Sequence, residues 1–261
     1  MVAKHIIVIP ACETNDKCKG YLDNLLQSLE QGGYFDAGYE AIIAYDNCSK
    51  EFQEHFYENY KDSNLSTVDN QNEHNLNFAA NVNTGLREAL RRGFDHVTIL
   101  NMDTIMPPYW HFDKVPGAGL SFPNPVDDPT IQLSKSGPDH VWEPTRQPVT
   151  KFSGFCMCLS KELVDKIGVI DEHFPGSFND DDLAARTLLA GFPVEVVNVK
   201  VHHELKDRQE PSNTGAYDGY ELGLGMDKYR RKWSIPRQVT HEQFNQWIVD
   251  NHQWNEAMKC I

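Results

Sequence analysis

Three adjacent carboxylates, Asp180, Asp181 and Asp182, form a compact acidic group in the second half of the chain. They stand at the start of a predicted helix, where the backbone dipole and free N–H groups favour acidic side chains. Three in a row exceed what a helix cap needs, and no Lys or Arg lies between Lys166 and Arg186 to neutralise them. An ionised carboxylate held near a hydroxyl is a usable general base, and Asp180 is our candidate for that role.

A second candidate group follows a predicted buried strand, in the run Asn101-Met102-Asp103-Thr104. A carboxylate in this place can coordinate Mg²⁺ or Mn²⁺, which take few protein oxygens and share their remaining positions with substrate phosphates. An Asp at a strand end also serves as a turn or cap residue, so Asp103 alone does not define a site. His203 follows the last predicted strand and is a candidate further ligand, because imidazole binds divalent transition metals.

These residues need a scaffold, and the sequence predicts strands that alternate with helices. Short apolar runs at 6–9, 41–45, 65–68 and 97–100 alternate with helical patterns that begin near residues 21, 51 and 78. This order, with its short connections, predicts an α/β fold with a single mostly parallel, Rossmann-like sheet flanked by helices. Ligands of such sheets bind at the carboxyl ends of the strands, here 11–13, 46–49 and 101–104.

The pattern is less regular beyond residue 106. The Pro- and Gly-rich segment 107–148 is predicted to hold a strand at 118–122 and then a long functional loop. The further predicted elements are strands at 150–160 and 194–201 and helices at 161–167, 181–190 and about 240–258. We predict one domain over 1–225, in two halves that meet near residue 105, with a basic helical tail over 226–261 packed on it.

Composition excludes several classes of protein. The chain has 261 residues, 24 Lys+Arg and 38 Asp+Glu, and a formal net charge of −14. That charge excludes a basic protein that coats nucleic acid. No stretch approaches the roughly 18 apolar residues of a membrane span, and the apolar run near the N-terminus is too short for a signal peptide. Six cysteines without a CxxC pair predict reduced thiols and a cytoplasmic location.

Taken in order, the motifs resemble the family 2 glycosyltransferases of the GT-A fold, in particular their rhamnosyltransferase-like branch. The run Ile7–Pro10 is similar to the first strand of that family, and Asp46-Asn47-Cys48-Ser49 to its Asp-Asn-x-Ser turn. Later matches are Asn75–Ala79 with Asn83 and Gly85, Leu100–Thr104 at the DxD motif, Ser153–Met157 with Gly168–Phe174, Asp180–Arg186, and Tyr229-x-x-Lys232-Trp233. The resemblance covers about residues 5–233. It departs at Asn101, which replaces the first Asp of DxD, and at Asn77, which replaces a usual glycine.

The resemblance implies an inverting, metal-dependent glycosyltransferase. It would move a sugar from a nucleotide-diphosphate donor, with UDP favoured, to an acceptor hydroxyl. The donor half would be about 1–105 and the acceptor half about 106–225. The implied donor-nucleotide contacts are Ala11, Glu13, Asp46, Asn75, Asn83 and Asp103. Asp103 would hold Mn²⁺ or Mg²⁺, with His203 as a further ligand, and Asp180 would be the base.

Candidate contacts to the acceptor or to the donor diphosphate come from Asp182 and from the basic tail residues Arg230, Arg231 and Lys232. A basic run of this kind is either a solvated surface or a lid whose cations reach the donor phosphates or an anionic acceptor. Both interpretations stay open at the level of the sequence.

Alternative functions also stay open. A non-catalytic nucleotide-sugar-binding protein is one, because Asn101 removes a carboxylate from the metal site. The acceptor is undefined: it is a saccharide, a small molecule or a modified base in DNA. A nucleotidyltransferase is disfavoured, because its Gly-rich basic loop after the first strand is absent from residues 11–16, and nothing indicates a paired-carboxylate glycosidase.

Overall fold

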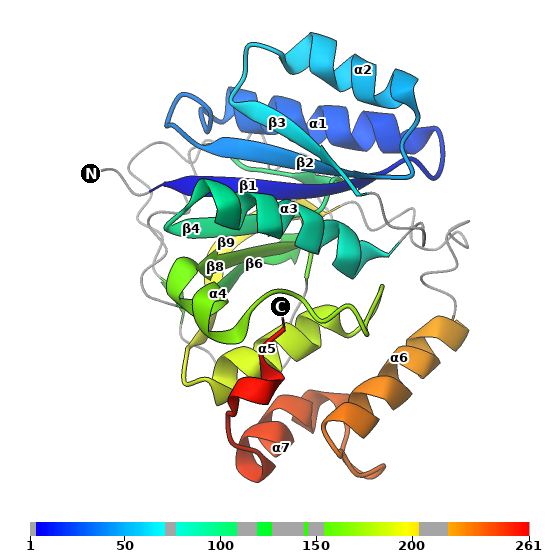
Figure 1. Ribbon diagram of the computed structural model, residues 1–261, viewed down its shortest axis with the longest axis vertical. Coiled ribbons are helices and arrows are strands. Elements are labelled where there is room, and N and C mark those ends of the chain that lie inside the picture. The colour runs from blue at the N-terminus through cyan, green and yellow to red at the C-terminus, as the bar shows by residue number, and fades with distance from the viewer. Residues whose placement is uncertain are drawn as a thin grey trace.

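The computed structural model describes residues 4–70, 77–108, 119–126, 144–145, 154–203 and 219–260. Over these residues the chain forms one sheet with helices on both faces (Figure 1). The strands are β1 His5–Cys12, β2 Glu40–Asp46, β3 Leu65–Asp69, β4 His96–Leu100, β5 Thr104–Ile105, β6 Leu120–Val126, β7 Pro144–Thr145, β8 Cys156–Ser160 and β9 Val194–His203. The helices are α1 Lys17–Gln31, α2 Lys50–Tyr60, α3 Phe78–Arg92, α4 Lys161–Ile167, α5 Asn179–Leu189, α6 Gly219–Lys232 and α7 Phe244–Asn251. The predicted α/β fold is confirmed.

The first half of the sheet is parallel, with the strands in the order β3-β2-β1-β4. β1 is buried on both faces, which explains its unbroken apolar sequence. Ile7 and Ile9 belong to the core under α1, whereas Ile6 and Val8 belong to the core under α3. Each such fully buried side chain stabilises the fold by about 1.5–3 kcal/mol. α3 lies so close to β1 that a Cβ on Gly85 would stand 2.4 Å from Val8 Cγ1.

The second half of the sheet is mixed. β8 runs antiparallel to both β4 and β6, and β9 runs parallel to β6 but antiparallel to β5. Pairing of β5 with β9 places Thr104 opposite His203. The parallel, Rossmann-like prediction therefore applies to the first four strands of the sheet, and much of the loop predicted over 107–148 lies outside the described residues.

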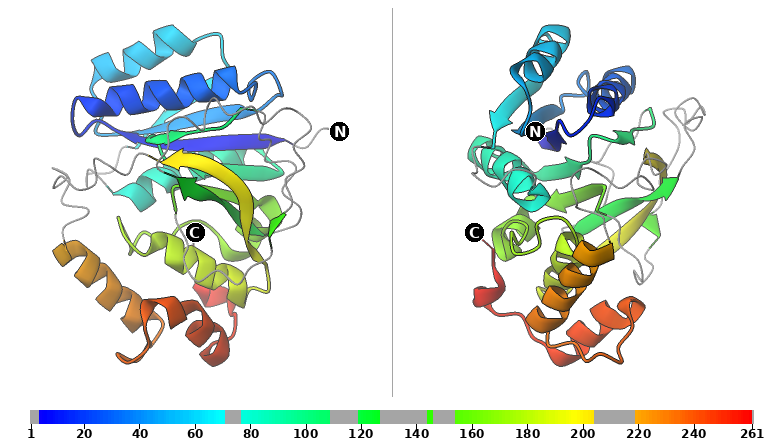
Figure 2. Two further views of the ribbon diagram at one scale, coloured as in Figure 1. Left: turned by 180° about the vertical axis from the view of Figure 1, so that it is seen from behind. Right: turned by 90° about the vertical axis from the view of Figure 1, so that its right-hand side faces the viewer.

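The C-terminal tail packs on α5. Views from behind and from the side show α6 and α7 grouped at the end of the molecule opposite α1 and α2 (Figure 2). The shared core contains Phe174, Phe178, Ala185, Tyr229, Trp233, Ile235, Phe244 and Ile248. The boundary predicted at 225 falls inside α6, which runs through that position as one helix.

The helix predicted near 240–258 is wrong in its extent. α7 ends at Asn251, and His252 takes an extended conformation. The imidazole Nε2 of His252 lies 2.8 Å from the carbonyl oxygen of Trp233, which draws the chain away from the helix axis. A separate short 3₁₀ turn follows at Glu256–Met258. Among the described helices, none is long and apolar enough to cross a membrane.

Candidate active site

The carboxyl ends of β1 and β2 form the first part of the candidate site. Asp46, the last residue of β2, is 2% exposed. The carboxylate of Glu13 accepts a hydrogen bond from the Ser49 amide at 2.6 Å, which fixes the loop after β1 to the turn after β2. The buried Ala11 carbonyl accepts from Asn81 Nδ2 at 3.3 Å. Three of the residues predicted to contact a nucleotide therefore lie at one edge of the sheet.

The three remaining predicted nucleotide contacts are Asn83, Asn75 and Asp103, and Asp103 lies with the predicted metal ligands beyond β4. Asn83 is 1% exposed, and its amide joins α3 to the segment after α4. Its Nδ2 donates to the Ile170 carbonyl at 2.8 Å, and its Oδ1 accepts from the Ile170 amide at 3.0 Å. Both ends of the amide are therefore used inside the fold, and the contact of Asn83 with a nucleotide stays a prediction. Asn75 lies outside the described residues.

Asn77 explains one departure from the family motif. It is the N-cap of α3, and its side chain accepts a hydrogen bond from the Ala80 amide at 3.0 Å. Asn is among the favoured N-cap residues because its oxygen satisfies a free N–H of the first turn. The replacement of glycine therefore strengthens the start of the helix that borders the site.

The predicted metal ligands meet beyond β4. Antiparallel pairing of β5 with β9 brings the end of β9 beside the turn that carries Asp103. His203 Nε2 lies 3.3 Å from Asp103 Oδ1. The His203 side chain is 1% exposed and stacks on Phe155, with ring centroids 4.6 Å apart, whereas that of Asp103 is 23% exposed. The rigid imidazole and the accessible carboxylate form a pair that a cation can reach from solvent.

Asn101 stands two residues before Asp103, where DxD proteins carry their first Asp. Its Oδ1 is buried and has no hydrogen-bond partner among the described residues. A buried acceptor left in this state normally costs about 1–3 kcal/mol, so it calls for a partner. Carboxylate, amide and imidazole groups are suitable ligands for Mn²⁺. Mg²⁺ prefers the carboxylate and amide oxygens among them. The residues fit a divalent cation, although the described part of the chain contains no cluster of three His, Cys, Asp or Glu ligands.

Asp180 is held at the start of α5. Its Oδ2 accepts from the Gly154 amide at 3.0 Å, and its Oδ1 accepts from the Asp181 amide at 3.0 Å. The chain enters α5 through Phe178, which has a left-handed conformation at φ 66° and ψ 6°. Such backbone strain in a residue other than glycine costs about 1–3 kcal/mol and concentrates at functional sites. The carboxylate is therefore fixed in one orientation.

The electrostatics of Asp180 suit proton transfer. Burial, together with the negative charge of neighbouring Asp181, raises the pKa of the Asp180 carboxyl to about 7. A general base is most effective when its pKa lies near the working pH. The surroundings of Asp180 therefore suit a base that works near neutral pH.

One dipeptide joins the two halves of the site. Gly154 donates its amide to Asp180, whereas the ring of the next residue, Phe155, stacks on His203. The Phe155 carbonyl also accepts from the Asn101 amide at 2.8 Å. The base and the candidate metal ligands therefore contact a single rigid turn that leads into β8.

Asp182 does not face the site. Its side chain is fully buried and forms an ion pair with Arg186, whose Nε lies 2.8 Å from Asp182 Oδ2. Its other oxygen lies 2.5 Å from Lys232 Nζ and accepts from Trp233 Nε1 at 3.1 Å. We therefore correct the predicted substrate contact of Asp182: the residue fastens the tail to α5.

The same geometry gives the Tyr-x-x-Lys-Trp motif a structural role. Tyr229 donates its hydroxyl to the Asp181 carbonyl at 3.2 Å, and Lys232 and Trp233 bind Asp182. All three therefore clamp α6 onto the helix that carries Asp180. Lys232 Nζ is paired with Asp171 and Asp182 in this structure, and its contact with a substrate phosphate stays a prediction.

The two tail arginines, Arg230 and Arg231, have different surroundings. Arg230 donates to the carbonyls of Pro236 and Val239 at 2.6 and 2.8 Å, and it lies over the Phe244 ring. It therefore stabilises the turn between α6 and α7, and its contact with a substrate stays a prediction. Arg231 is exposed and lines a cavity beside α6.

Sequence reasoning did not identify two residues that act on Asp180 and Asp181. The Gly154 amide holds Asp180, and a Cβ at Gly154 would stand 2.8 Å from Asp180 Cβ, so the contact requires glycine. His241 Nε2 lies 3.4 Å from Asp181 Oδ2, and this hydrogen bond raises the pKa of His241. The glycine in the Ser-Gly-Phe motif was the available signal for the first, and no pattern indicated the second.

No protein-family model and no curated protein matches the sequence. Solved structures do match. S. aureus TarS aligns over 94% of this chain and 47% of its own, with 15% identity and a TM-score of 0.56. The chain thus spans about half the length of that protein, and it spans 70% of a TarS 1–349 structure in complex with UDP-GlcNAc, with a TM-score of 0.61.

Two further structures show the same likeness. A mannosyltransferase from Pyrobaculum calidifontis, in complex with GDP-Man and Mn²⁺, covers 95% of this chain and 72% of its own, with 15% identity and a TM-score of 0.58. Glucosyl-3-phosphoglycerate synthase from Mycobacterium tuberculosis, in complex with Mn²⁺, UDP and phosphoglyceric acid, covers 91% and 81%, with 14% identity and a TM-score of 0.54. The chain therefore has the fold of the GT-A glycosyltransferases.

Proposed function

We propose that the protein is an inverting glycosyltransferase that moves a sugar from a nucleotide-diphosphate donor to an acceptor hydroxyl. The observation that carries the proposal is the buried Asp180 carboxylate, fixed by the Gly154 amide at 3.0 Å and with a pKa raised to about 7 by burial and by Asp181. The same turn supports the Asp103–His203 pair. A base and a candidate diphosphate site thus share one scaffold.

In this mechanism Asp180 accepts the proton of the acceptor hydroxyl as its oxygen attacks the anomeric carbon. The bond to the diphosphate breaks in the same displacement, so the configuration at that carbon inverts. The Gly154 amide keeps Oδ2 oriented, which avoids the cost of ordering the base at the moment of reaction. General-base catalysis of this kind contributes about 10²–10⁴ in rate.

Asp103, His203 and Asn101 would hold a divalent cation, Mn²⁺ or Mg²⁺. When bound, the cation would neutralise charge on the leaving diphosphate. Support comes from the metal-binding chemistry of these three side chains. It also comes from the buried Asn101 Oδ1, which has no hydrogen-bond partner among the described residues. Structures of two similar proteins also contain Mn²⁺.

Glu13, Asp46 and the Ala11 backbone would contact the donor nucleotide. We favour UDP, because UDP or UDP-GlcNAc is present in structures of two of the similar proteins, although a third contains GDP-Man. A cytoplasmic location suits both the donor and the six free thiols. The domain of 1–225 with its tail would act as one catalytic unit, because α6 is clamped to the helix of the base.

A non-catalytic nucleotide-sugar binder is the second candidate, favoured by Asn101 in place of a carboxylate. A thermal-shift panel of UDP- and GDP-sugars with Mn²⁺ and Mg²⁺ tests donor binding for both candidates. We expect one nucleotide class to raise the melting temperature in a metal-dependent way. If no nucleotide sugar shifts it, both candidates fail.

A further inference from the structure

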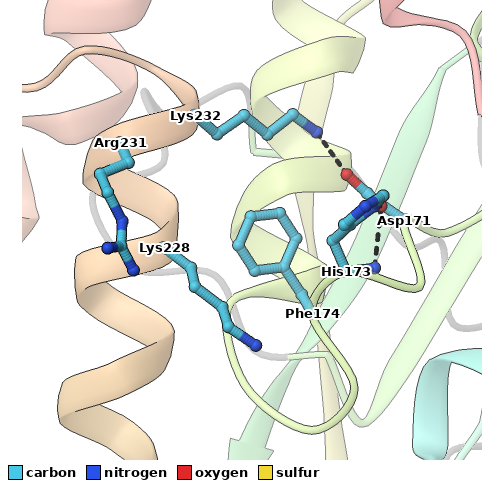
Figure 3. A pocket seen from close by; sticks show the side chains of 6 residues that line it. All are labelled: Asp171, His173, Phe174, Lys228, Arg231 and Lys232. Atoms are coloured by element: carbon cyan, nitrogen blue, oxygen red, sulfur yellow. Dashed lines mark hydrogen bonds and ion pairs between the residues drawn. The ribbon is translucent and has the colours of Figure 1, made fainter.

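A cavity of about 440 Å³ lies between α6 and the segment that leads into α5 (Figure 3). It is lined by Asp171, His173, Phe174, Lys228, Arg231 and Lys232. The volume is typical of a site for a small ligand. One lining residue is bonded to the start of α5: the carbonyl of Phe174 accepts from the side chain of Asn179, the residue before Asp180, at 3.4 Å.

Two of the charged lining residues, Asp171 and Lys232, belong to a group of four charges that balance one another. Lys232 Nζ lies 2.8 Å from Asp171 Oδ2 and 2.5 Å from Asp182 Oδ1, and Arg186 pairs with the second oxygen of Asp182. Although burial opposes it, the Lys232 ammonium lowers the pKa of Asp171 to about 2. Two carboxylates and two cations leave no net charge, so this group offers no cation to a ligand.

The remaining two cations, Lys228 and Arg231, are different. They stand three residues apart on the exposed face of α6, and neither has a carboxylate partner within the described part of the chain. Like charges at this spacing repel each other on a helix. Lys228 extends from α6 toward the loop that carries Phe174 (Figure 3). In a protein with a net charge of −14, two cations on one cavity that have no carboxylate partner among the described residues indicate a place for an anion.

We propose that this cavity binds a phosphomonoester group of the acceptor. The assignment rests on the proposed glycosyl transfer and specifies its second substrate. A phosphomonoester carries nearly two negative charges at neutral pH and matches the two cations Lys228 and Arg231, whereas a carboxylate or a phosphodiester carries one. Arg231 supplies a planar fork for phosphate oxygens and Lys228 a point charge. A phosphate would fill only part of the cavity. The remaining space, beside Phe174, would hold the part of the acceptor that bears the hydroxyl.

Calorimetric titration of the full chain with glycerol 3-phosphate tests the proposal without any turnover. We expect Lys228→Ala and Arg231→Ala each to weaken binding about tenfold, and the double variant about 100-fold. Glycerate and dimethyl phosphate, which carry one negative charge, should bind at least tenfold more weakly than glycerol 3-phosphate. UDP binding in the presence of Mn²⁺ should be the same in the double variant and the wild type.

The matched control is Arg91→Ala/Lys161→Ala, which removes the same charge. Arg91 is in the last turn of α3 and Lys161 begins α4 at the opposite edge of the sheet, so this variant should bind glycerol 3-phosphate normally. Equal binding by the Lys228/Arg231 double variant and the wild type would overturn the proposal, as would equal affinity for the singly charged probes. A loss of UDP affinity in the double variant would also overturn it, because the cavity would then belong to the donor. If glycerol 3-phosphate binds as expected but no sugar is transferred, only the proposed function fails.

Discussion

The Gly154 amide donates a hydrogen bond to Asp180 Oδ2 over 3.0 Å, and Gly154 leaves no room for a side chain on that contact. The two residues are 26 positions apart in the sequence. Gly154 lies in the turn before β8, and Asp180 lies in the first turn of α5. Their contact sets the orientation of the carboxylate. The relationship makes Gly154 a positioning residue for the proposed base.

Gly154→Ala should lower kcat by about 10²-fold and leave donor KM unchanged, because misplacing a catalytic group by about 1 Å has that effect. The added Cβ would stand 2.8 Å from Asp180 Cβ and displace it. Steady-state kinetics with saturating acceptor measures the two constants. Gly20→Ala on α1 is the control, because no atom lies within 4 Å of its added Cβ, and it should keep full activity. Normal kcat in Gly154→Ala would remove the positioning role.

Activity should rise with pH through about 7, because the deprotonated Asp180 is the base and burial and Asp181 raise its pKa to about 7. The pH profile of kcat/KM reports this group in the free enzyme. Asp181→Asn removes the neighbouring charge and should move the rising limb to lower pH. Glu58→Gln, which changes an exposed side chain of α2, should not move it. If the rising limb of the wild-type pH profile had its midpoint near pH 4, the pKa of an ordinary Asp, the raised pKa of Asp180 would be contradicted.

The same pKa predicts a cost in stability. Between about pH 4 and pH 7 the folded state keeps a proton on Asp180 that the unfolded chain has lost, so Asp180 destabilises the fold as pH rises through that window. Asp180→Asn should therefore raise the melting temperature more at pH 8 than at pH 4. Thermal denaturation at the two pH values measures the difference, and an equal change at both would contradict it.

Asp182→Ala should destabilise the protein by about 3–5 kcal/mol, because it leaves the buried Arg186 without its charge partner. Urea denaturation followed by circular dichroism measures the loss. Asp165→Ala removes an exposed ion pair with Lys161 at the same spacing and should cost at most about 1 kcal/mol. If Asp182→Ala kept its stability and raised the acceptor KM, the original prediction of a substrate contact would be restored.

Asn101→Asp should tighten Mn²⁺ binding about tenfold, because it adds a carboxylate to the ligand set near Asp103. Calorimetric titration with Mn²⁺ measures the affinity, and Asp103→Ala should remove the binding. An affinity unchanged by both substitutions would show that the cation, if any, is held elsewhere.

Much of the fold could be predicted from local patterns. The apolar runs predicted β1 to β4, and helix α4 was predicted with its observed bounds, because the side chains that define these elements are neighbours in sequence. Strand ends of a parallel sheet meet at one edge, which is why Glu13 and Asp46 were placed together. The pairing of β5 with β9 and the extent of α6 depend on distant contacts, so the sequence did not reveal them.

A motif match does not fix the direction in which a side chain points. Asn83 and Asp182 belong to family motifs, yet both are buried and bonded inside the fold. The spacing of Asp182 and Arg186, four residues apart on one helix, was a signal of an ion pair. The Gly154 amide carries no side-chain signal, since its role is that of a backbone group brought beside Asp180 by the sheet.

The central claim is that Asp180 is the base of glycosyl transfer. The most direct test compares wild type and Asp180→Asn for nucleotide release and sugar transfer, with Mn²⁺ and the donor chosen by thermal shift. We predict transfer by the wild type and a loss of about 10²–10⁴ in rate for the folded variant, with donor affinity unchanged. Donor binding without nucleotide release by the wild type, or equal rates for the two proteins, would contradict the account.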